Sequence, residues 1–162
     1  MTSHNTSPRG PLARRRPALG LPLIAVIGLA LLAAPRVVLH DLDIIHEGTF
    51  VNALFVFVPP VVWIAVVLWK RVPNPFLTLL VVGLFYGVFL AVGHQVLWEA
   101  AFGDNPPVLG GNLGDVDPAV QSLILRLFAA VSSVFTGVIV GAITGLVAWG
   151  LGKVVPSGAR EA

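Results

Sequence analysis

The residues best suited to chemistry are three histidines and two carboxylates between positions 40 and 94. Four of them fall within one stretch of eight residues and the fifth follows in a later segment: His40, Asp43, His46, Glu47 and His94. Neutral imidazole nitrogens and carboxylate oxygens are common ligands of zinc and similar ions. These five residues are therefore candidate ligands of a divalent metal. The alternative is a solvated acidic loop in which they have ordinary polar partners, because their spacing matches no established metal-binding motif.

Arg126 is a cation within an otherwise apolar stretch, which makes it a candidate for an ion pair. It precedes Ser133 by seven residues, so on a helix it lies within about 20° of the row of small residues that includes Ser133. Such a row is a packing surface, so we expect Arg126 to point at protein. The first choice of partner is Glu47, with Asp43 and Glu99 as further candidates. The alternative is a lone arginine whose long side chain extends to water.

The sequence contains none of the motifs of common enzyme classes. It has no nucleophile elbow, no Walker loop, no zinc-protease helix and no dinucleotide fingerprint. The absence of cysteine excludes disulfides, thiolate metal sites and cysteine nucleophiles. Asp115 and Asp117 lie in a glycine- and proline-rich stretch, but its register fits neither an EF-hand nor a glycine-rich calcium repeat. We therefore expect no catalytic residues, and no cofactor beyond a divalent metal at the histidines.

The composition of the chain is very apolar and predicts which secondary structure carries these residues. Of the 162 residues, 56% are apolar and 11% are charged, and the mean hydropathy is +0.90. Soluble domains have roughly 45–50% apolar and about 25% charged residues. A chain of this size cannot hide so much apolar surface in its own core, so a lipid bilayer must cover it. The formal net charge is only +2 and the basic residues flank apolar segments, so we expect no nucleic-acid partner.

Four apolar segments are long enough to cross the ~30 Å hydrocarbon layer as helices. They run at about 18–34, 50–69, 75–98 and 119–151. The apolar runs are continuous, so the sequence predicts an all-α fold in which residues 18–155 form a bundle of four transmembrane helices. Residues 1–17 are polar, basic and rich in proline, which predicts a disordered tail, and residues 156–162 form a short C-terminal tail.

Charged residues divide between the two sides of this arrangement. Eight of the ten basic residues fall on one side: Arg9, Arg14, Arg15, Arg16, Lys70, Arg71, Lys153 and Arg160. Seven of the eight acidic residues fall on the other: Asp41, Asp43, Glu47, Glu99, Asp104, Asp115 and Asp117. Because basic connections stay inside, we expect a multi-pass protein of the bacterial cytoplasmic membrane with both termini cytoplasmic. Trp69 and Trp149 fit an inner aromatic belt and Trp98 fits an outer one.

Prolines raise two questions about the first two segments: whether the first is cleaved, and whether the second is kinked. Arginines before the first segment and small residues before Pro35 resemble a cleaved signal peptide, although Leu32 stands where such peptides need a small residue. We keep the first segment as a span, with cleavage as the alternative. Pro59 and Pro60 lie in the middle of the second segment and predict a kink, which is either static or a hinge.

Two segments carry small residues at every fourth position, a glycine-zipper pattern typical of close helix packing. The fourth segment has five of them: Ala129, Ser133, Gly137, Gly141 and Gly145. The third segment has three: Gly83, Gly87 and Ala91. Residues four apart share one helix face, so a neighbouring backbone can approach closely there. Either the two helices pack on each other within one chain, or the row binds a second copy or another membrane subunit.

The connection after the first segment has polar residues at spacings of four, three and four: Arg36, His40, Asp43 and Glu47. On a helix these residues would share one face, and the apolar residues between them would point away. The pattern predicts an amphipathic helix at the membrane surface.

These patterns favour a non-enzymatic integral membrane protein: an accessory subunit, a scaffold or a homo-oligomer that associates through its small-residue faces. The alternative is a membrane protein with an outward-facing site of histidines and carboxylates that binds a metal or a small ligand.

Overall fold

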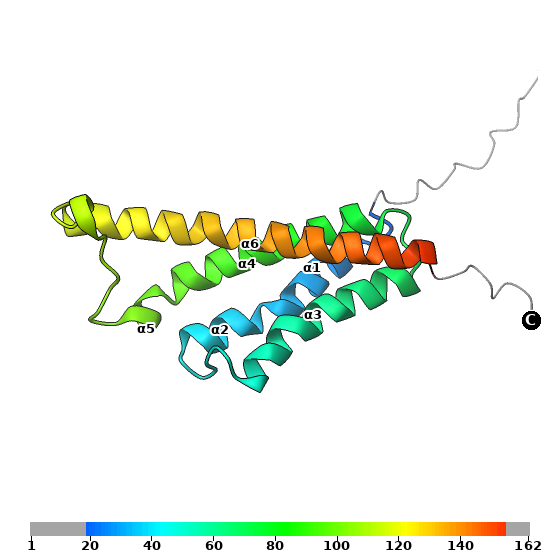
Figure 1. Cartoon of the computed structure of the whole chain (residues 1–162), viewed down its shortest axis with the longest axis horizontal. Coiled ribbons are helices and arrows are strands. Elements are labelled where there is room, and N and C mark those ends of the chain that lie inside the picture. Colours follow the sequence, from blue (N-terminus) through cyan, green and yellow to red (C-terminus); the bar gives the residue numbers. More distant parts are fainter. Residues whose placement is uncertain (1–18, 155–162) are drawn as a thin grey trace, which may run out of the picture.

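A computed structural model describes residues 19–154, which are largely helical (Figure 1). The helices are α1 (Leu23–Ala33), α2 (Pro35–Asp41), α3 (Phe50–Trp69), α4 (Pro75–Val96), α5 (Trp98–Phe102) and α6 (Pro118–Val154), with a short 3-10 turn at Gly111–Leu113. No β-strand occurs between residues 19 and 154. Four helical stretches in this range are long and apolar enough to cross a membrane, and α1 and α2 together form the first. The predicted all-α class with four apolar helices is confirmed for these residues.

The observed bounds follow the predicted ones closely in the second, third and fourth segments. Polar caps fix the starts of two helices. The Thr49 side chain accepts a hydrogen bond from the N–H of Asn52 at 3.2 Å, and the Asn74 side chain accepts one from the N–H of Leu77 at 3.0 Å. Each cap partners one of the N–H groups that a helix start leaves free. The tails predicted at 1–17 and 156–162 lie outside the described residues.

The first span is longer than the sequence predicts, because Pro35 does not end it. α2 begins at Pro35, and Ala34 between α1 and α2 keeps helical backbone angles (φ −64°, ψ −32°). Proline fits the first turn of a helix, where the N–H that it lacks would have no partner within the helix. The span therefore continues to Asp41 and carries Arg36 and His40 in its last turns.

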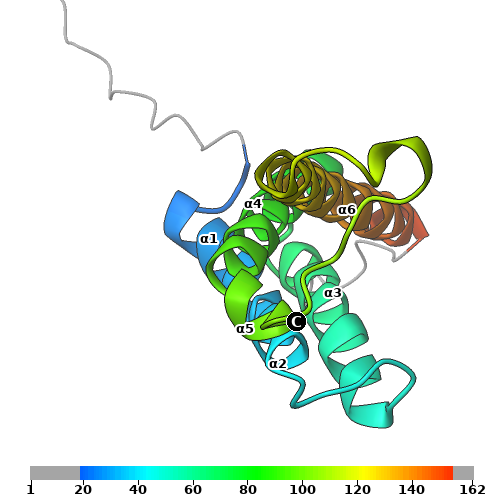
Figure 2. The ribbon, with the colours of Figure 1, turned by 90° about the vertical axis from the view of Figure 1, so that its left-hand side faces the viewer.

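Successive long stretches run in opposite directions, so alternate connections lie at the same end of the bundle (Figure 1). The charged residues in these connections therefore make the two ends different. One end, called the basic end, carries Lys70, Arg71 and Lys153. The other, called the acidic end, holds the α2–α3 and α4–α6 connections with Asp43, Glu47, Glu99, Asp104, Asp115 and Asp117. α3 and α6 lie close together at the basic end and diverge toward the acidic end (Figures 1 and 2).

The closest packing joins α4 and α6 along their small residues. A Cβ atom added at Gly137 would collide with backbone atoms of Gly83 and Gly87. One added at Gly141 would lie 2.6 Å from the carbonyl oxygen of Leu79. The remaining members of the two rows are also buried or half-buried: Ala91, Ala129, Ser133 and Gly145. Of the two arrangements that the sequence leaves open, the structure therefore has the two helices packed on each other within one chain.

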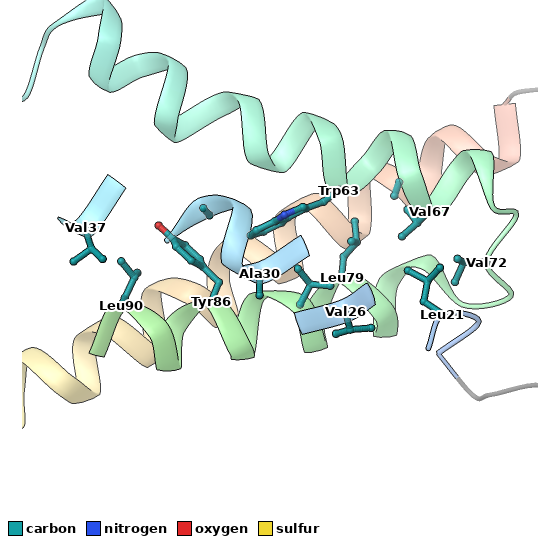
Figure 3. Close-up of a cluster of buried hydrophobic side chains, with 13 residues drawn as sticks. Leu21, Val26, Ala30, Val37, Trp63, Val67, Val72, Leu79, Tyr86 and Leu90 are labelled. Atoms are coloured by element: carbon teal, nitrogen blue, oxygen red, sulfur yellow. The ribbon is translucent and has the colours of Figure 1, made fainter. Parts of the chain in front are cut away.

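The rest of the core lies between α1, α3 and α4 around Trp63, whose side chain has no solvent exposure (Figure 3). The indole N–H of Trp63 donates to the carbonyl oxygen of Leu29 at 2.7 Å, and its ring meets the Tyr86 ring edge-on with 5.8 Å between centroids. The hydroxyl of Thr78 donates to the carbonyl oxygen of Leu19 at 2.7 Å. These hydrogen bonds fix the register of helices whose contacts are otherwise apolar.

α3 continues without interruption through Pro59 and Pro60. Each proline lacks the N–H that would bond to the carbonyl one turn earlier, at Phe55 and Val56. The kink or hinge expected at this place stays a prediction.

The tryptophans at the two ends differ in exposure. Trp69 and Trp149 are exposed at the basic end, as an aromatic belt requires. Trp98, expected in an outer belt, is instead buried. The reason is that the Arg126 guanidinium covers its ring at 4.8 Å from the centroid, and Phe102 packs against it at 4.8 Å between centroids.

Candidate functional site at the acidic end

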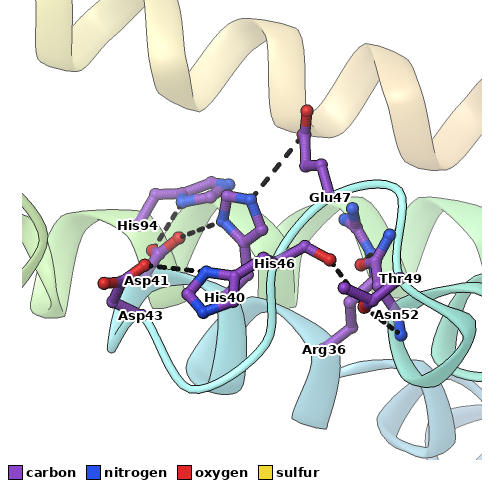
Figure 4. Close-up of polar contacts among 9 residues, drawn as sticks. All are labelled: Arg36, His40, Asp41, Asp43, His46, Glu47, Thr49, Asn52 and His94. Atoms are coloured by element: carbon purple, nitrogen blue, oxygen red, sulfur yellow. Dashed lines mark hydrogen bonds and ion pairs between the residues drawn. The ribbon is translucent and has the colours of Figure 1, made fainter.

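Polar side chains at the acidic end converge on Asp41, the last residue of α2. The Asp41 side chain is only 6% exposed. The ring of His94, in the last turn of α4, donates from Nδ1 to Oδ2 of Asp41 at 2.7 Å, and Nδ1 of His40 lies 3.5 Å from Oδ1 (Figure 4). A carboxylate is costly to remove from water without partners, so the two imidazole rings are what stabilise it in this position.

The bond to Asp41 determines what the rest of the His94 ring can do. In a neutral ring with its proton on Nδ1, the other nitrogen, Nε2, carries a free lone pair. Nε2 of His94 has no hydrogen bond to any residue between 19 and 154, and the ring is 36% exposed. A carboxylate that orients a histidine in this way is a recurring part of acid–base and ligand-binding sites.

The chain after α2 does not form the predicted amphipathic helix. α2 ends at Asp41, and Asp43 has a φ of +57°, a left-handed conformation that aspartate adopts more readily than most residues. The N–H of Ile45 donates to the carbonyl oxygen of Leu39 at 3.2 Å, and Ile45 is buried. Burying Ile45 therefore turns the chain back on α2, so Asp43 and Glu47 do not share a helical face with the residues before them.

The five candidate metal ligands separate into two groups. His40 and His94 lie beside Asp41, and Nε2 of His40 also approaches the exposed Glu47 carboxylate at 3.7 Å. The other two residues lie apart in the loop, with Nδ1 of His46 3.1 Å from Oδ1 of Asp43. Within the described part of the chain, no three His, Asp or Glu side chains are arranged to hold a metal ion. The geometry favours hydrogen bonding over metal coordination.

A cavity of about 270 Å³, called the acidic-end cavity, opens beside Asp41 and the two histidines. Its other walls come from α5 and α6: Trp98, Ala101, Phe102, Ala129, Ser132 and Ser133. The hydroxyls of Ser132 and Ser133 donate to the carbonyl oxygen of Ala129 at 3.1 and 2.6 Å. Small side chains on α6 thus leave space here, where α3 has already diverged from α6 (Figure 1).

Arg126 has a different partner from the expected Glu47. Its Nη2 lies 2.8 Å from Oε1 of Glu99, and its guanidinium covers the ring of Trp98. Its backbone carbonyl accepts a hydrogen bond from the side chain of Gln95 at 3.0 Å. The reason for the difference is α5, which brings Glu99 to α6, whereas Glu47 lies beside His40 in the other connection. Arg126 therefore links α5 to α6 at the acidic end.

The α4–α6 connection is held by Gln121, a buried residue on the first turn of α6. Its side-chain oxygen accepts from the N–H of Leu109 at 2.9 Å, and its amide group donates to the carbonyl oxygens of Gly114 at 3.1 Å and Val116 at 2.7 Å. This amide therefore partners three backbone groups of a segment that has little secondary structure of its own.

Sequence reasoning missed the central residue of the site. In the sequence, Pro35 suggests that the first span ends there, which places Asp41 in the connection that follows. Asp41 then has no role beyond being one of several acidic residues in that connection. Had Pro35 been read as the first residue of a continuing helix, Asp41 would have stood at the end of an apolar span beside His40. A carboxylate at the end of an apolar span needs a polar partner, and this requirement is the signal that could have identified Asp41 as a site residue.

Comparison of the chain with protein-family models, with curated proteins and with solved structures gives no match. The geometry of the acidic end is therefore the basis of the functional argument.

Proposed function

We propose that this protein is a four-pass integral membrane protein, with both termini in the cytoplasm, that binds a small ligand in the acidic-end cavity on the outer side. The observation that carries the proposal is the nearly buried Asp41 carboxylate, held between His40 and His94 on the cavity wall. Apolar residues would stabilise this end at least as well as a partly buried charge network, so packing alone does not account for these residues.

The membrane part of the proposal rests on length, hydropathy and charge. The four stretches have 19 to 37 residues, and each contains an 18-residue window with a mean hydropathy between 2.1 and 2.4. Many large apolar side chains on them are exposed in the isolated chain and would be covered by lipid, among them Phe57, Val61, Phe135 and Leu146. Basic residues favour the cytoplasmic side, which assigns the basic end to the cytoplasm and the acidic end to the outside.

Single cysteines test this topology, because the chain has no cysteine of its own. On intact cells, a membrane-impermeant maleimide should label Asp104→Cys, in the α4–α6 connection, and should label Pro73→Cys, in the α3–α4 connection, only after permeabilisation. The opposite pattern would contradict the assigned orientation. A mature chain that begins near Pro35 would show instead that the first segment is a cleaved signal peptide.

The ligand-binding part rests on the variety of groups that face one cavity. Its walls combine a carboxylate–histidine pair, two hydroxyl groups and the aromatic rings of Trp98 and Phe102. A mostly apolar recess with a few convergent polar groups is the usual form of a small-molecule site.

Native mass spectrometry of the full chain, released from mild detergent, tests whether a small molecule is bound. We expect one to accompany the unmodified protein and to be lost from Asp41→Asn, which keeps the shape of the side chain but not its charge. His46→Ala is the matched control, since His46 also contacts a carboxylate but lies away from the cavity. An unmodified protein that carries no small molecule, even after extraction of the whole sample, would contradict the proposal.

A second candidate, a homo-oligomer or accessory subunit, is favoured by the length of α6. Its 37 residues extend over about 55 Å at 1.5 Å per residue, well beyond a hydrocarbon layer of about 30 Å. Exposed apolar residues lie in its first three turns, among them Leu123, Leu127 and Phe128. Since Gly137, Gly141 and Gly145 of the small-residue row already pack within the chain, an interface would use this projecting end.

Light scattering in detergent tests the second candidate. An oligomer, or a complex with another membrane subunit, should dissociate in Leu123→Gln/Leu127→Gln. A monomer that co-purifies with no other subunit would exclude this candidate and would leave the ligand-binding proposal unaffected.

A further inference from the structure

The size of the acidic-end cavity limits what it can hold. Its volume of about 270 Å³ is slightly below the roughly 300–1,000 Å³ of sites that enclose a whole small ligand. A larger molecule would therefore place only its head in the cavity, and the rest would lie outside.

The charges at the cavity disfavour an ionic head. Oδ2 of Asp41 is hydrogen-bonded to His94 at 2.7 Å and Oδ1 lies 3.5 Å from Nδ1 of His40, so a cation would have to compete with two imidazole rings for this carboxylate. An anion would lie close to the Asp41 carboxylate, with Glu47 beside His40. The carboxylates would repel an anion, and a cation would lose hydration on entering the cavity. An uncharged head therefore fits best.

The hydrogen-bonding groups that face the cavity mainly offer lone pairs. When the His94 ring is neutral, its single proton lies on Nδ1 and is donated to Asp41, so Nε2 is an acceptor. The hydroxyl protons of Ser132 and Ser133 are used by the carbonyl oxygen of Ala129, which leaves their oxygens as acceptors too. A cavity with acceptors to satisfy selects a head that donates, and an uncharged donor of suitable size is a hydroxyl group.

An apolar surface begins where the cavity ends. Phe128 and Phe135 lie four residues before and three residues after Ser132, so all three share one side of α6. The two phenylalanine side chains are 71% and 65% exposed, and Ile139, four residues beyond Phe135, is exposed as well. A molecule with its head beside Ser132 can therefore lay an apolar tail along Phe135 and Ile139, toward the basic end.

We propose that the acidic-end cavity binds the head of an uncharged amphiphile, whose hydroxyl group donates a hydrogen bond to Nε2 of His94 while its apolar tail lies along Phe135 and Ile139. This inference rests on the proposed ligand-binding function and names the chemical class of its ligand. Two sources share that chemistry: a hydroquinone with an alkyl tail and a lipid alcohol such as a diacylglycerol.

The test uses the full chain in phosphatidylcholine nanodiscs, with ¹⁵N-labelled histidine. We titrate it separately with a decyl-tailed hydroquinone, with dioctanoylglycerol and with the dimethyl ether of the same hydroquinone. The ether keeps the ring and tail but has no hydroxyl proton. A hydroxyl ligand should shift the Nε2 resonance of His94 in a saturable way and leave His46 unchanged. Loss of one hydrogen bond should make the ether bind about tenfold more weakly.

Variants give a second readout that separates head and tail. His94→Ala should weaken binding of the hydroxyl ligand about tenfold, whereas His46→Ala should not change it. Phe135→Ser should weaken the decyl-tailed hydroquinone more than a tail-free hydroquinone, because only the former contacts that residue. The ether comparison on the unmodified protein needs no variant, so it decides the question even if a substitution prevents folding.

The outcomes distinguish this inference from the function on which it rests. A His94 response to the hydroquinone alone, to the diacylglycerol alone or to both supports the inference and identifies the source. Equal binding of hydroquinone and ether overturns it. If neither hydroxyl ligand affects His94 but a molecule of another class co-purifies in an Asp41-dependent way, the ligand class is wrong and the proposed function stands. If no molecule of any kind is found, both are wrong.

Discussion

The two halves of α6 use small side chains in opposite ways. Toward the basic end, Gly137 and Gly141 lie so close to α4 that no Cβ atom fits between the backbones, and the Thr144 hydroxyl bonds back to the carbonyl of Val140 at 2.7 Å. Toward the acidic end, Gly87 still packs on the backbone of Ser133 and Val134, but the side chains of Ala129, Ser132 and Ser133 line a cavity. The row of small residues is continuous in sequence, but only part of it is filled by a partner helix.

A face of small residues therefore does not by itself determine whether it packs against another helix. Close packing results where glycines of α4 meet it, since two bare backbones can then approach. A cavity results where the facing residue is His94 and α3 has moved away (Figure 2). The opposing residue decides whether this face is packed or lines a cavity.

The largest effect is expected at the closed half. Gly137→Ala places a Cβ against the backbone of Gly83 and Gly87, which cannot move without separating the helices. The free energy of unfolding in mixed micelles should fall by about 3 kcal/mol. Gly150→Ala is the matched control in the same helix, because nothing lies within 4 Å of the added atom. It should be neutral or stabilising by up to about 1 kcal/mol, as alanine favours helix. Equal losses at both positions would show that the packing at Gly137 is not special.

An intermediate effect is expected at the open half. Asp41→Ala removes the partner of the His94 Nδ1–H, so the free energy of unfolding should fall by about 2 kcal/mol. Asp43→Asn, a control on an exposed carboxylate that also contacts a histidine, should cost less than about 0.5 kcal/mol, because asparagine also tolerates the positive φ of this position. Chemical denaturation of both variants measures the difference. A silent Asp41→Ala would mean that the carboxylate does not hold the two histidines in place.

The smallest effect is expected for the ion pair at the edge of the cavity. Glu99 is 83% exposed, so its coupling to Arg126 should be only about 0.5 kcal/mol in a double-mutant cycle with Arg126→Gln and Glu99→Gln. The cycle of Arg126→Gln with Glu47→Gln should show additive effects, since the structure places Glu47 beside His40. Coupling to Glu47 instead of Glu99 would contradict the observed arrangement of α5.

The sequence predicted the long helices better than the site, for a physical reason. α3 could be placed from its apolar run alone, which is a local feature. The partner of Arg126 depends on how α5 turns after α4, and the role of Asp41 depends on the path of the chain through Pro35. Both are set by contacts between segments far apart in the chain, such as the one between Asp41 and His94, which no local pattern encodes.

Cysteines at two positions on α6 test whether the half of the bundle toward the acidic end holds an open cavity while the half toward the basic end is closed. On intact cells, a membrane-impermeant maleimide should react with Ser132→Cys, which lines the cavity, and not with Thr144→Cys, which is buried near the basic end. A hydroxyl ligand that occupies the cavity should slow the reaction of Ser132→Cys. Failure of Ser132→Cys to react from outside, or equal reaction at both positions, would contradict the account.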